Sequence, residues 1–94
     1  MIDSNDIKVR ETESILMYTT SWCADCTRVK KFFANHALTF DEIDIEQSPE
    51  AAARVEEING GNRSVPTIIV EFSDDTQETL VEPTWEELQD VFLE

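Results

Sequence analysis

The sequence predicts an α/β domain in which helices cover both faces of a four-stranded mixed sheet, with the elements in the order βαβαββα. Two observations support this fold class. A strand-like run, a helix-like segment and a second strand-like segment follow one another, which favours a right-handed crossover between parallel strands. Two β-rich segments separated by a turn then favour an antiparallel hairpin in the same sheet. Because 94 residues can bury only one modest core, we expect a single domain.

The first half of the chain supplies two strands and one helix. Residues 1–13 mix charged with scattered apolar residues and show no clear period, so we expect an N-terminal extension before a domain spanning residues 14–94. The continuous apolar run 14–18 is typical of a central strand covered on both faces. Apolar residues recur at helical spacing over residues 24–35, and residues 40–45 alternate as a more exposed strand.

The second half supplies two helices and a hairpin. Ser48-Pro49 provides an N-cap and a proline at the first helical position, and Gly60-Gly61 ends the helix that follows. Residues 67–72 are β-branched and apolar, and residues 77–81 return as their partner strand after a turn. Thr84-Trp85-Glu86-Glu87 is a capping box that begins the last helix.

The charge of the chain excludes several classes of partner. With 21 acidic and 7 basic residues, the formal charge of −14 opposes binding to nucleic acid or to an anionic membrane. Arg28, Lys30 and Lys31 form a basic island after the cysteines, which we interpret as a solvated helix face. No apolar run approaches the ~20 residues that span a bilayer, and residues 1–6 do not resemble a signal peptide, so we expect a cytoplasmic protein.

The two cysteines, Cys23 and Cys26, form one C-x-x-C between the first strand and the first helix. This arrangement favours redox or metal chemistry in a reducing compartment over a structural disulfide framework. Unpaired backbone N–H groups and the helix dipole stabilise a thiolate there, which lowers the pKa of Cys23 below the free value of about 8.5. Cys26 lies one turn further in, so we expect Cys23 to attack a disulfide and Cys26 to resolve the product.

A metal site is the competing interpretation of the cysteine pair. Structural zinc needs four ligands, and beyond the pair only His36 is available, so we expect no metal and predict that His36 is a surface residue. The neighbouring Trp22 is either a core residue or one wall of a substrate groove that shields the sulfur. The sequence favours neither interpretation of Trp22.

Three segments together resemble glutaredoxins of the mycoredoxin kind. They are Tyr18-Thr19-Thr20-Ser21-Trp22-Cys23-Ala24-Asp25-Cys26, the acidic, alanine-rich helix after Pro49, and Asn59-Gly60-Gly61-Asn62-Arg63-Ser64-Val65-Pro66-Thr67. The similarity covers about residues 14–93. It implies a thioredoxin fold in its minimal form and a cytoplasmic disulfide reductase with mycothiol as its small-thiol partner. It also implies a cis Val65-Pro66 peptide that faces the cysteines and whose backbone pairs with the substrate.

The resemblance also implies roles for individual residues. Cys23 corresponds to the nucleophile, Cys26 to the resolving thiol, and Ser64-Val65-Pro66 to a Thr-Val-Pro loop with one exchange. Arg63 would meet a carboxylate or a sugar hydroxyl of the thiol, or it remains a solvated loop charge. The residues expected to bind the thiol are Trp22, Asp25, Arg63, Ser64, Val65, Pro66 and Thr84.

Three departures from the family pattern concern the small thiol and the nucleophile. Asp25 replaces a tyrosine, Thr20 replaces the lysine of many glutathione-type members, and Val81-Glu82-Pro83-Thr84 replaces a Gly-Gly turn. These exchanges argue against glutathione as the small-thiol partner. A carboxylate at Asp25, ~7 Å from Cys23, opposes the thiolate by roughly 0.6–2.4 kcal/mol. We therefore expect a near-neutral, mildly depressed Cys23 pKa and a more reducing couple than one with tyrosine at position 25.

The leading hypothesis is an enzyme that reduces mixed disulfides between proteins and a small thiol. We expect a monomer without a bound cofactor, acting on S-thiolated or disulfide-containing proteins. Two alternatives stay open. One is a dithiol electron donor recharged by thioredoxin reductase, and the other is a module that holds an iron–sulfur cluster between two protomers through the first cysteine and the small thiol.

Overall fold

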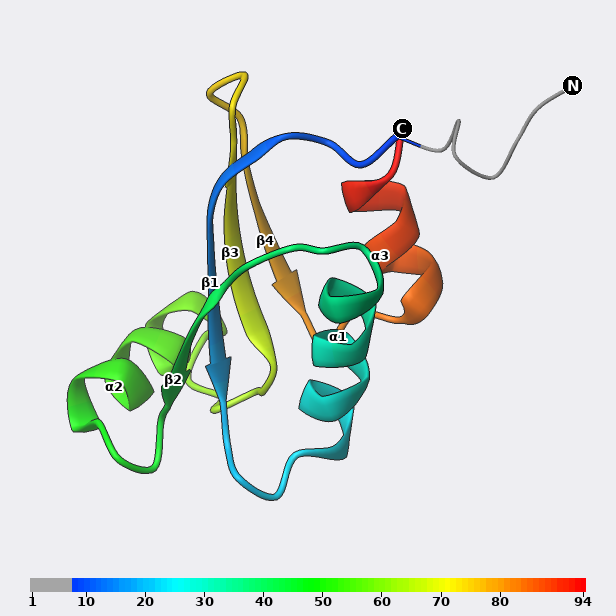
Figure 1. Ribbon diagram of the computed structural model, residues 1–94. Coiled ribbons are helices and arrows are strands. Elements are labelled where there is room, and N and C mark those ends of the chain that lie inside the picture. Colours follow the sequence, from blue (N-terminus) through cyan, green and yellow to red (C-terminus); the bar gives the residue numbers. More distant parts are fainter. Residues whose placement is uncertain (1–7) are drawn as a thin grey trace, which may run out of the picture.

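The computed structural model describes residues 8–94 and contains the predicted elements in the predicted order (Figure 1). The strands are β1 (Thr12–Thr19), β2 (Asp41–Asp44), β3 (Thr67–Phe72) and β4 (Gln77–Val81), and the helices are α1 (Ala24–Asn35), α2 (Pro49–Ile58) and α3 (Trp85–Phe92). β1 and β2 pair in parallel, whereas β3 pairs antiparallel with both β1 and β4. The sheet order is β2-β1-β3-β4, which confirms the predicted four-stranded mixed sheet.

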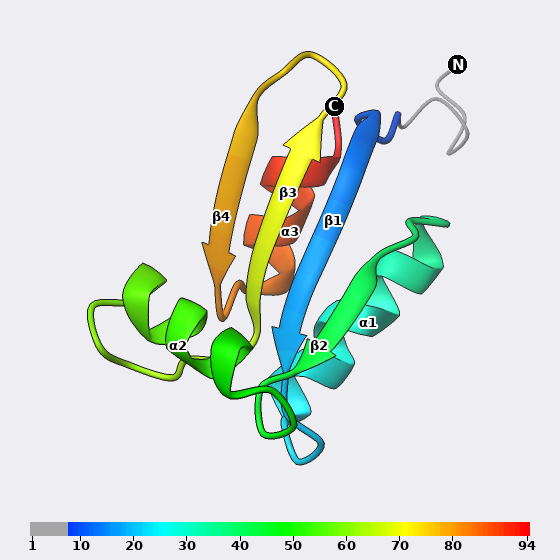
Figure 2. The same ribbon diagram turned by 90° about the vertical axis from the view of Figure 1, so that its left-hand side faces the viewer.

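The two faces of the sheet are covered by different helices. α1 and α3 lie on one face and α2 lies on the other (Figures 1 and 2). On the first face, Phe92 of α3 packs against Phe32 and Phe33 of α1, with ring centroids 6.0 and 5.5 Å away, and against Phe72 of β3 at 6.0 Å. All four phenylalanines are buried, so this aromatic cluster joins both helices to the sheet.

The bounds of two strands differ from the prediction. β1 begins at Thr12, within the stretch assigned to the N-terminal extension, because Thr12 pairs with Phe72 and the N–H of Arg10 donates to the carbonyl of Phe92 at 2.8 Å. Residues 1–7 of that stretch lie outside the described residues. β2 spans only residues 41–44 because its pairing ends where β1 ends, with Thr19 opposite Asp44.

The helix caps appear where the sequence predicts them. Ser48 accepts the N–H of Ala51 at 3.2 Å, and both hydrogen bonds of the capping box at Thr84 are present. Gly60 and Gly61 both have positive φ, as the chain turns away from the end of α2. Within residues 8–94, none of the helices is long and apolar enough to cross a membrane.

We predict that Phe92→Ala lowers the free energy of unfolding by about 3–5 kcal/mol, because it removes the ring that contacts two helices and the sheet and leaves a cavity. Denaturant unfolding followed by circular dichroism measures this loss. Trp22→Ala, an aromatic truncation at a position that is 71% exposed, is the matched control and should cost less than about 1 kcal/mol. Equal losses in the two variants would contradict the assigned core.

Candidate active site

Three connections meet at one end of the sheet (Figure 1). The connection from β1 to α1 ends at Cys23, and Cys26 lies in the first turn of α1. Tyr18, near the end of β1, pairs with Thr67 at the start of β3, so Pro66 lies at this same end. The N–H of Glu82, which follows β4, donates to the carbonyl of Pro66 at 2.9 Å. The connections after β1, before β3 and after β4 therefore lie together at the end of the sheet that bears the cysteine pair, and we call this end the active-site surface.

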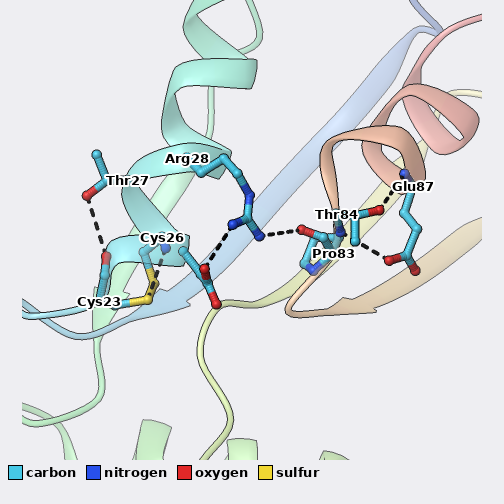
Figure 3. Close-up of polar contacts among 8 residues, drawn as sticks. Cys23, Cys26, Thr27, Arg28, Pro83, Thr84 and Glu87 are labelled. Atoms are coloured by element: carbon cyan, nitrogen blue, oxygen red, sulfur yellow. Dashed lines mark hydrogen bonds and ion pairs between the residues drawn. A yellow bond between two sulfur atoms is a disulfide. The ribbon is translucent and has the colours of Figure 1, made fainter.

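Cys23 and Cys26 form a disulfide at the start of α1, with their Cα atoms 5.2 Å apart (Figure 3). Cys23 is the N-cap of the helix, and its sulfur accepts the backbone N–H of Cys26 at 3.0 Å. The residue exposures are 9% for Cys23 and 1% for Cys26. A hydrogen bond and a helix N-terminus directed at the sulfur favour its negatively charged form, so in the reduced protein Cys23 has the surroundings of a nucleophile.

Asp25 is paired with a cation that the sequence-based estimate did not include. Nη1 of Arg28 donates to Asp25 at 2.9 Å. Nη2 of the same guanidinium donates to the carbonyl of Pro83 at 3.0 Å (Figure 3). Pro83 is buried and precedes Thr84, the N-cap of α3. Asp25 is therefore not the isolated charge assumed above, and Arg28 links the turn that bears the cysteines to the connection before α3.

A polar cavity of about 340 Å³ lies on the β2 side of the cysteine pair. Besides both cysteines, it is lined by Thr19, Thr20, Ser21, Thr27, Lys30, Glu42 and Asp44. Lys30 forms an ion pair with Glu42, and the hydroxyl of Thr19 donates to the same carboxylate at 2.8 Å. The hydrogen bond from Lys30 lowers the pKa of Glu42; partial burial opposes this, while the Thr19 hydroxyl and the charge of Lys30 lower it further.

The basic island predicted after the cysteines is thus partly neutralised. Of its three cations, Arg28 contacts Asp25 and Lys30 contacts Glu42. The side chains of Arg28 and Lys30 are only about two-fifths exposed, so the island is more than a solvated helix face. The spacing of Asp25 and Arg28, three residues apart on one helix, was visible in the sequence as a pairing signal. The contact between Lys30 and Glu42 needs the position of β2 and has no local signal.

The loop before β3 contains the predicted cis Val65-Pro66 peptide, which is confirmed. Val65 and Pro66 are buried, and the carbonyl of Ser64 accepts the hydroxyl of Thr67 at 2.7 Å. Arg63 is exposed and its Nε donates to Glu56 at 2.6 Å, so its guanidinium already has a carboxylate partner within the chain. The exposure of Arg63 and its partner within the chain favour the interpretation of Arg63 as a solvated loop charge.

Two other predicted site residues also have defined positions. Trp22 is 71% exposed beside Cys23, which removes the core interpretation. Thr84 accepts the backbone N–H of Glu87 at 3.1 Å and so caps α3, at the connection that Arg28 contacts. The structure therefore shows that Thr84 caps a helix, and its contact with the thiol stays a prediction.

His36 has intermediate exposure, so it lies at the surface with its ring partly covered. Its ring lies 4.5 Å from the ring of Phe32, because residues four apart share a helix face. His36 caps the end of α1 opposite to Cys23, and a helix of 12 residues is about 18 Å long. His36 therefore cannot share a metal ion with the cysteines, and residues 8–94 contain no group of three or more potential ligands.

A β1-α1-β2 crossover, a β3-β4 hairpin, a final helix and a disulfide at the start of α1 define a thioredoxin-fold protein with a redox-active cysteine pair. The glutaredoxin family model matches residues 15–72. The chain belongs to the glutaredoxin family.

Known proteins agree with this assignment. A glutaredoxin-named protein of Mycobacterium tuberculosis is 42% identical over 78 residues, which cover 83% of this chain and 88% of the relative. Mycoredoxin 1 of Corynebacterium glutamicum is 38% identical over 66 residues, covering 70% of this chain and 78% of that protein. The crystal structure of a glutaredoxin from Archaeoglobus fulgidus superimposes with a TM-score of 0.64 at 26% identity, over 82% of this chain and 83% of the other.

We predict that Glu42→Gln makes the free energy of unfolding less dependent on pH in the acidic range. A carboxyl whose pKa is lowered by folding stabilises the native state above its unfolded pKa, and this contribution is lost as the pH falls through the folded-state pKa. At pH 7 the variant should be less stable than the wild type by at most about 1 kcal/mol, since the pair is partly exposed. The difference should shrink steadily as the pH falls below 4.

Chemical denaturation at a series of pH values measures this effect. Lys30→Met is the companion variant, because it removes the partner that lowers the Glu42 pKa, and it should also weaken the acid dependence. A constant difference between wild type and Glu42→Gln at all pH values would contradict the assigned role of the pair.

Proposed function

We propose that this glutaredoxin-family protein reduces mixed disulfides between proteins and a small thiol. The observation that carries the proposal is the asymmetry of the pair: the Cys23 sulfur caps the helix and accepts the Cys26 N–H, while Cys26 is almost fully buried. One sulfur is thus prepared as a nucleophile, and the other is within reach of it but shielded from an external disulfide.

The proposed reaction transfers the small thiol onto the enzyme. The Cys23 thiolate attacks the small-thiol sulfur of the mixed disulfide, the protein leaves as a thiolate, and the small thiol is now joined to Cys23. A second small-thiol molecule then attacks this bond, which regenerates Cys23 and yields the oxidised dimer of the small thiol. In the competing branch, Cys26 attacks Cys23 and releases the small thiol, which gives the Cys23–Cys26 disulfide present in the structure.

Mycothiol is the small thiol that we propose. The chain is similar to a protein named mycoredoxin, and the connection before α3 replaces a Gly-Gly turn with Val81-Glu82-Pro83-Thr84. Glu82, Glu86 and Glu87 are exposed around this connection, and Arg63 is occupied by Glu56. Glutathione brings two carboxylates to this acidic surface, whereas mycothiol is an uncharged sugar conjugate, so repulsion disfavours glutathione. We place this reaction in the cytoplasm, carried out by a monomer without a bound cofactor.

Separate substitution of the two cysteines tests the proposal. Cys23→Ser should reduce every activity to background, because no other thiolate reaches the substrate. Cys26→Ser should keep mixed-disulfide turnover within about tenfold of the wild type and lose the reduction of insulin disulfides, which needs two thiols. The assay supplies mycothiol, glutathione or thioredoxin reductase separately as the source of electrons.

The two variants are matched controls, since each exchanges one sulfur for oxygen in the same turn. Complete loss of mixed-disulfide turnover in Cys26→Ser, with electrons accepted from thioredoxin reductase by the wild type, would favour a dithiol electron donor instead. Activity that survives in Cys23→Ser would refute the assigned nucleophile. Turnover that is faster with glutathione than with mycothiol would refute the proposed thiol.

A further inference from the structure

Arg28 of α1 contacts two separate parts of the chain near the active site. One nitrogen of its guanidinium contacts Asp25 at 2.9 Å, and another contacts the carbonyl of Pro83 at 3.0 Å. The two partners are 58 residues apart in sequence (83 − 25) and belong to α1 and to the connection before α3. Arg28 is thus held at two points.

The contact with Asp25 matters because of where Asp25 lies. Cys23, Asp25 and Cys26 occupy one turn, and the carboxylate is two residues from the sulfur that becomes the nucleophile. Alone, this carboxylate would oppose a thiolate at Cys23. A cation in contact with the carboxylate replaces a single charge by an ion pair, and the field of an ion pair falls off faster with distance than that of a single charge.

The contact with Pro83 holds the guanidinium of this partly exposed ion pair in position. Both side chains are two-fifths or more exposed, at 40% for Arg28 and 45% for Asp25. Surface ion pairs are usually weak because two long side chains must be immobilised. Here the carbonyl of the buried Pro83 fixes the guanidinium from the other side, so the charge stays beside Asp25.

We propose that Arg28 is a positioning residue that cancels the charge of Asp25 at the Cys23 sulfur, and that the Pro83 carbonyl holds it there. Arg28 does not contact the sulfur in this role. It acts through Asp25, and it permits an acid to occupy the first helical turn without suppressing the nucleophile. The proposal goes beyond the proposed function, because it holds whichever small thiol or protein is the substrate.

Other charges near Cys23 are common to every variant in the test. The polar cavity beside Cys23 is also lined by Lys30, Glu42 and Asp44, of which Lys30 and Glu42 pair with each other. These three side chains come from α1 and β2, and none of them contacts the pair of Asp25 and Arg28 through a hydrogen bond or ion pair among residues 8–94. Their contribution is therefore a constant background.

The experiment measures the pH midpoint of Cys23 alkylation in the reduced Cys26→Ser protein, where Cys23 is the only thiol. Arg28→Gln should raise the midpoint by between about half a unit and two units, because Asp25 is left uncompensated. Asp25→Asn should lower it, since the cation remains. The double variant Asp25→Asn/Arg28→Gln should have a midpoint close to that of the Cys26→Ser protein with both side chains intact. Arg28→Lys should have a midpoint between that protein and Arg28→Gln.

Two further measurements separate this effect from a structural one. Lys31→Gln removes one exposed charge from the same helix and is the matched control for net charge. The shift in Arg28→Gln should also shrink in 1 M salt, where the screening length is about 3 Å, whereas a structural defect would persist. If Arg28→Gln does not fold, Arg28→Lys tests the same direction.

An unchanged midpoint in Arg28→Gln and Arg28→Lys would overturn the proposal. So would a shift in Lys31→Gln as large as that in Arg28→Gln, or a double variant that stays at the value of Arg28→Gln. Because alkylation needs no natural substrate, failure here is distinct from failure of the mixed-disulfide proposal.

Discussion

The hydrogen bond from the Cys26 N–H to the Cys23 sulfur is the contact on which the site depends. The same N-cap to N3 bond begins the other two helices, from Ala51 to Ser48 and from Glu87 to Thr84. The C-x-x-C spacing is therefore also a capping spacing. A sulfur in the cap position receives the free N–H groups of the first turn, and this favours its anionic form. In the function proposed here, helix initiation and activation of the Cys23 nucleophile are therefore one requirement.

This double use of the first turn creates a conflict at Asp25. A carboxylate in the first turn of a helix is favoured by the helix dipole, but the same carboxylate disfavours a thiolate one position before that turn. The contact with Arg28 reconciles the two effects, because it leaves the acid in place and neutralises its charge. Arg28 reaches Asp25 from the same helix, three residues further on, and its second contact, with the carbonyl of Pro83, depends on the connection before α3 lying beside α1.

Local signals account for what the sequence predicts correctly, and distant contacts account for what it does not. Periodicity and caps placed every helix, including the box at Thr84, and the C-x-x-C located the redox site. The start of β1 depended on pairing of Thr12 with Phe72, and the partial covering of the His36 ring depended on packing against Phe32. The contact of Arg28 with Pro83 joins residues 55 positions apart, so no local pattern could indicate it.

Two exposed apolar side chains lie at the end of the sheet that carries the disulfide. Within residues 8–94, the large apolar side chains that are strongly exposed are Trp22, at 71%, and Val81, at 40%. Trp22 precedes Cys23, and Val81 pairs with Thr67 beside the Pro66 loop, so both lie at the end of the sheet that carries the disulfide. The bonds from Glu82 to Pro66 and from Arg28 to Pro83 join the connections at this end of the sheet to one another and to α1, so contacts within the chain fix the positions of these connections.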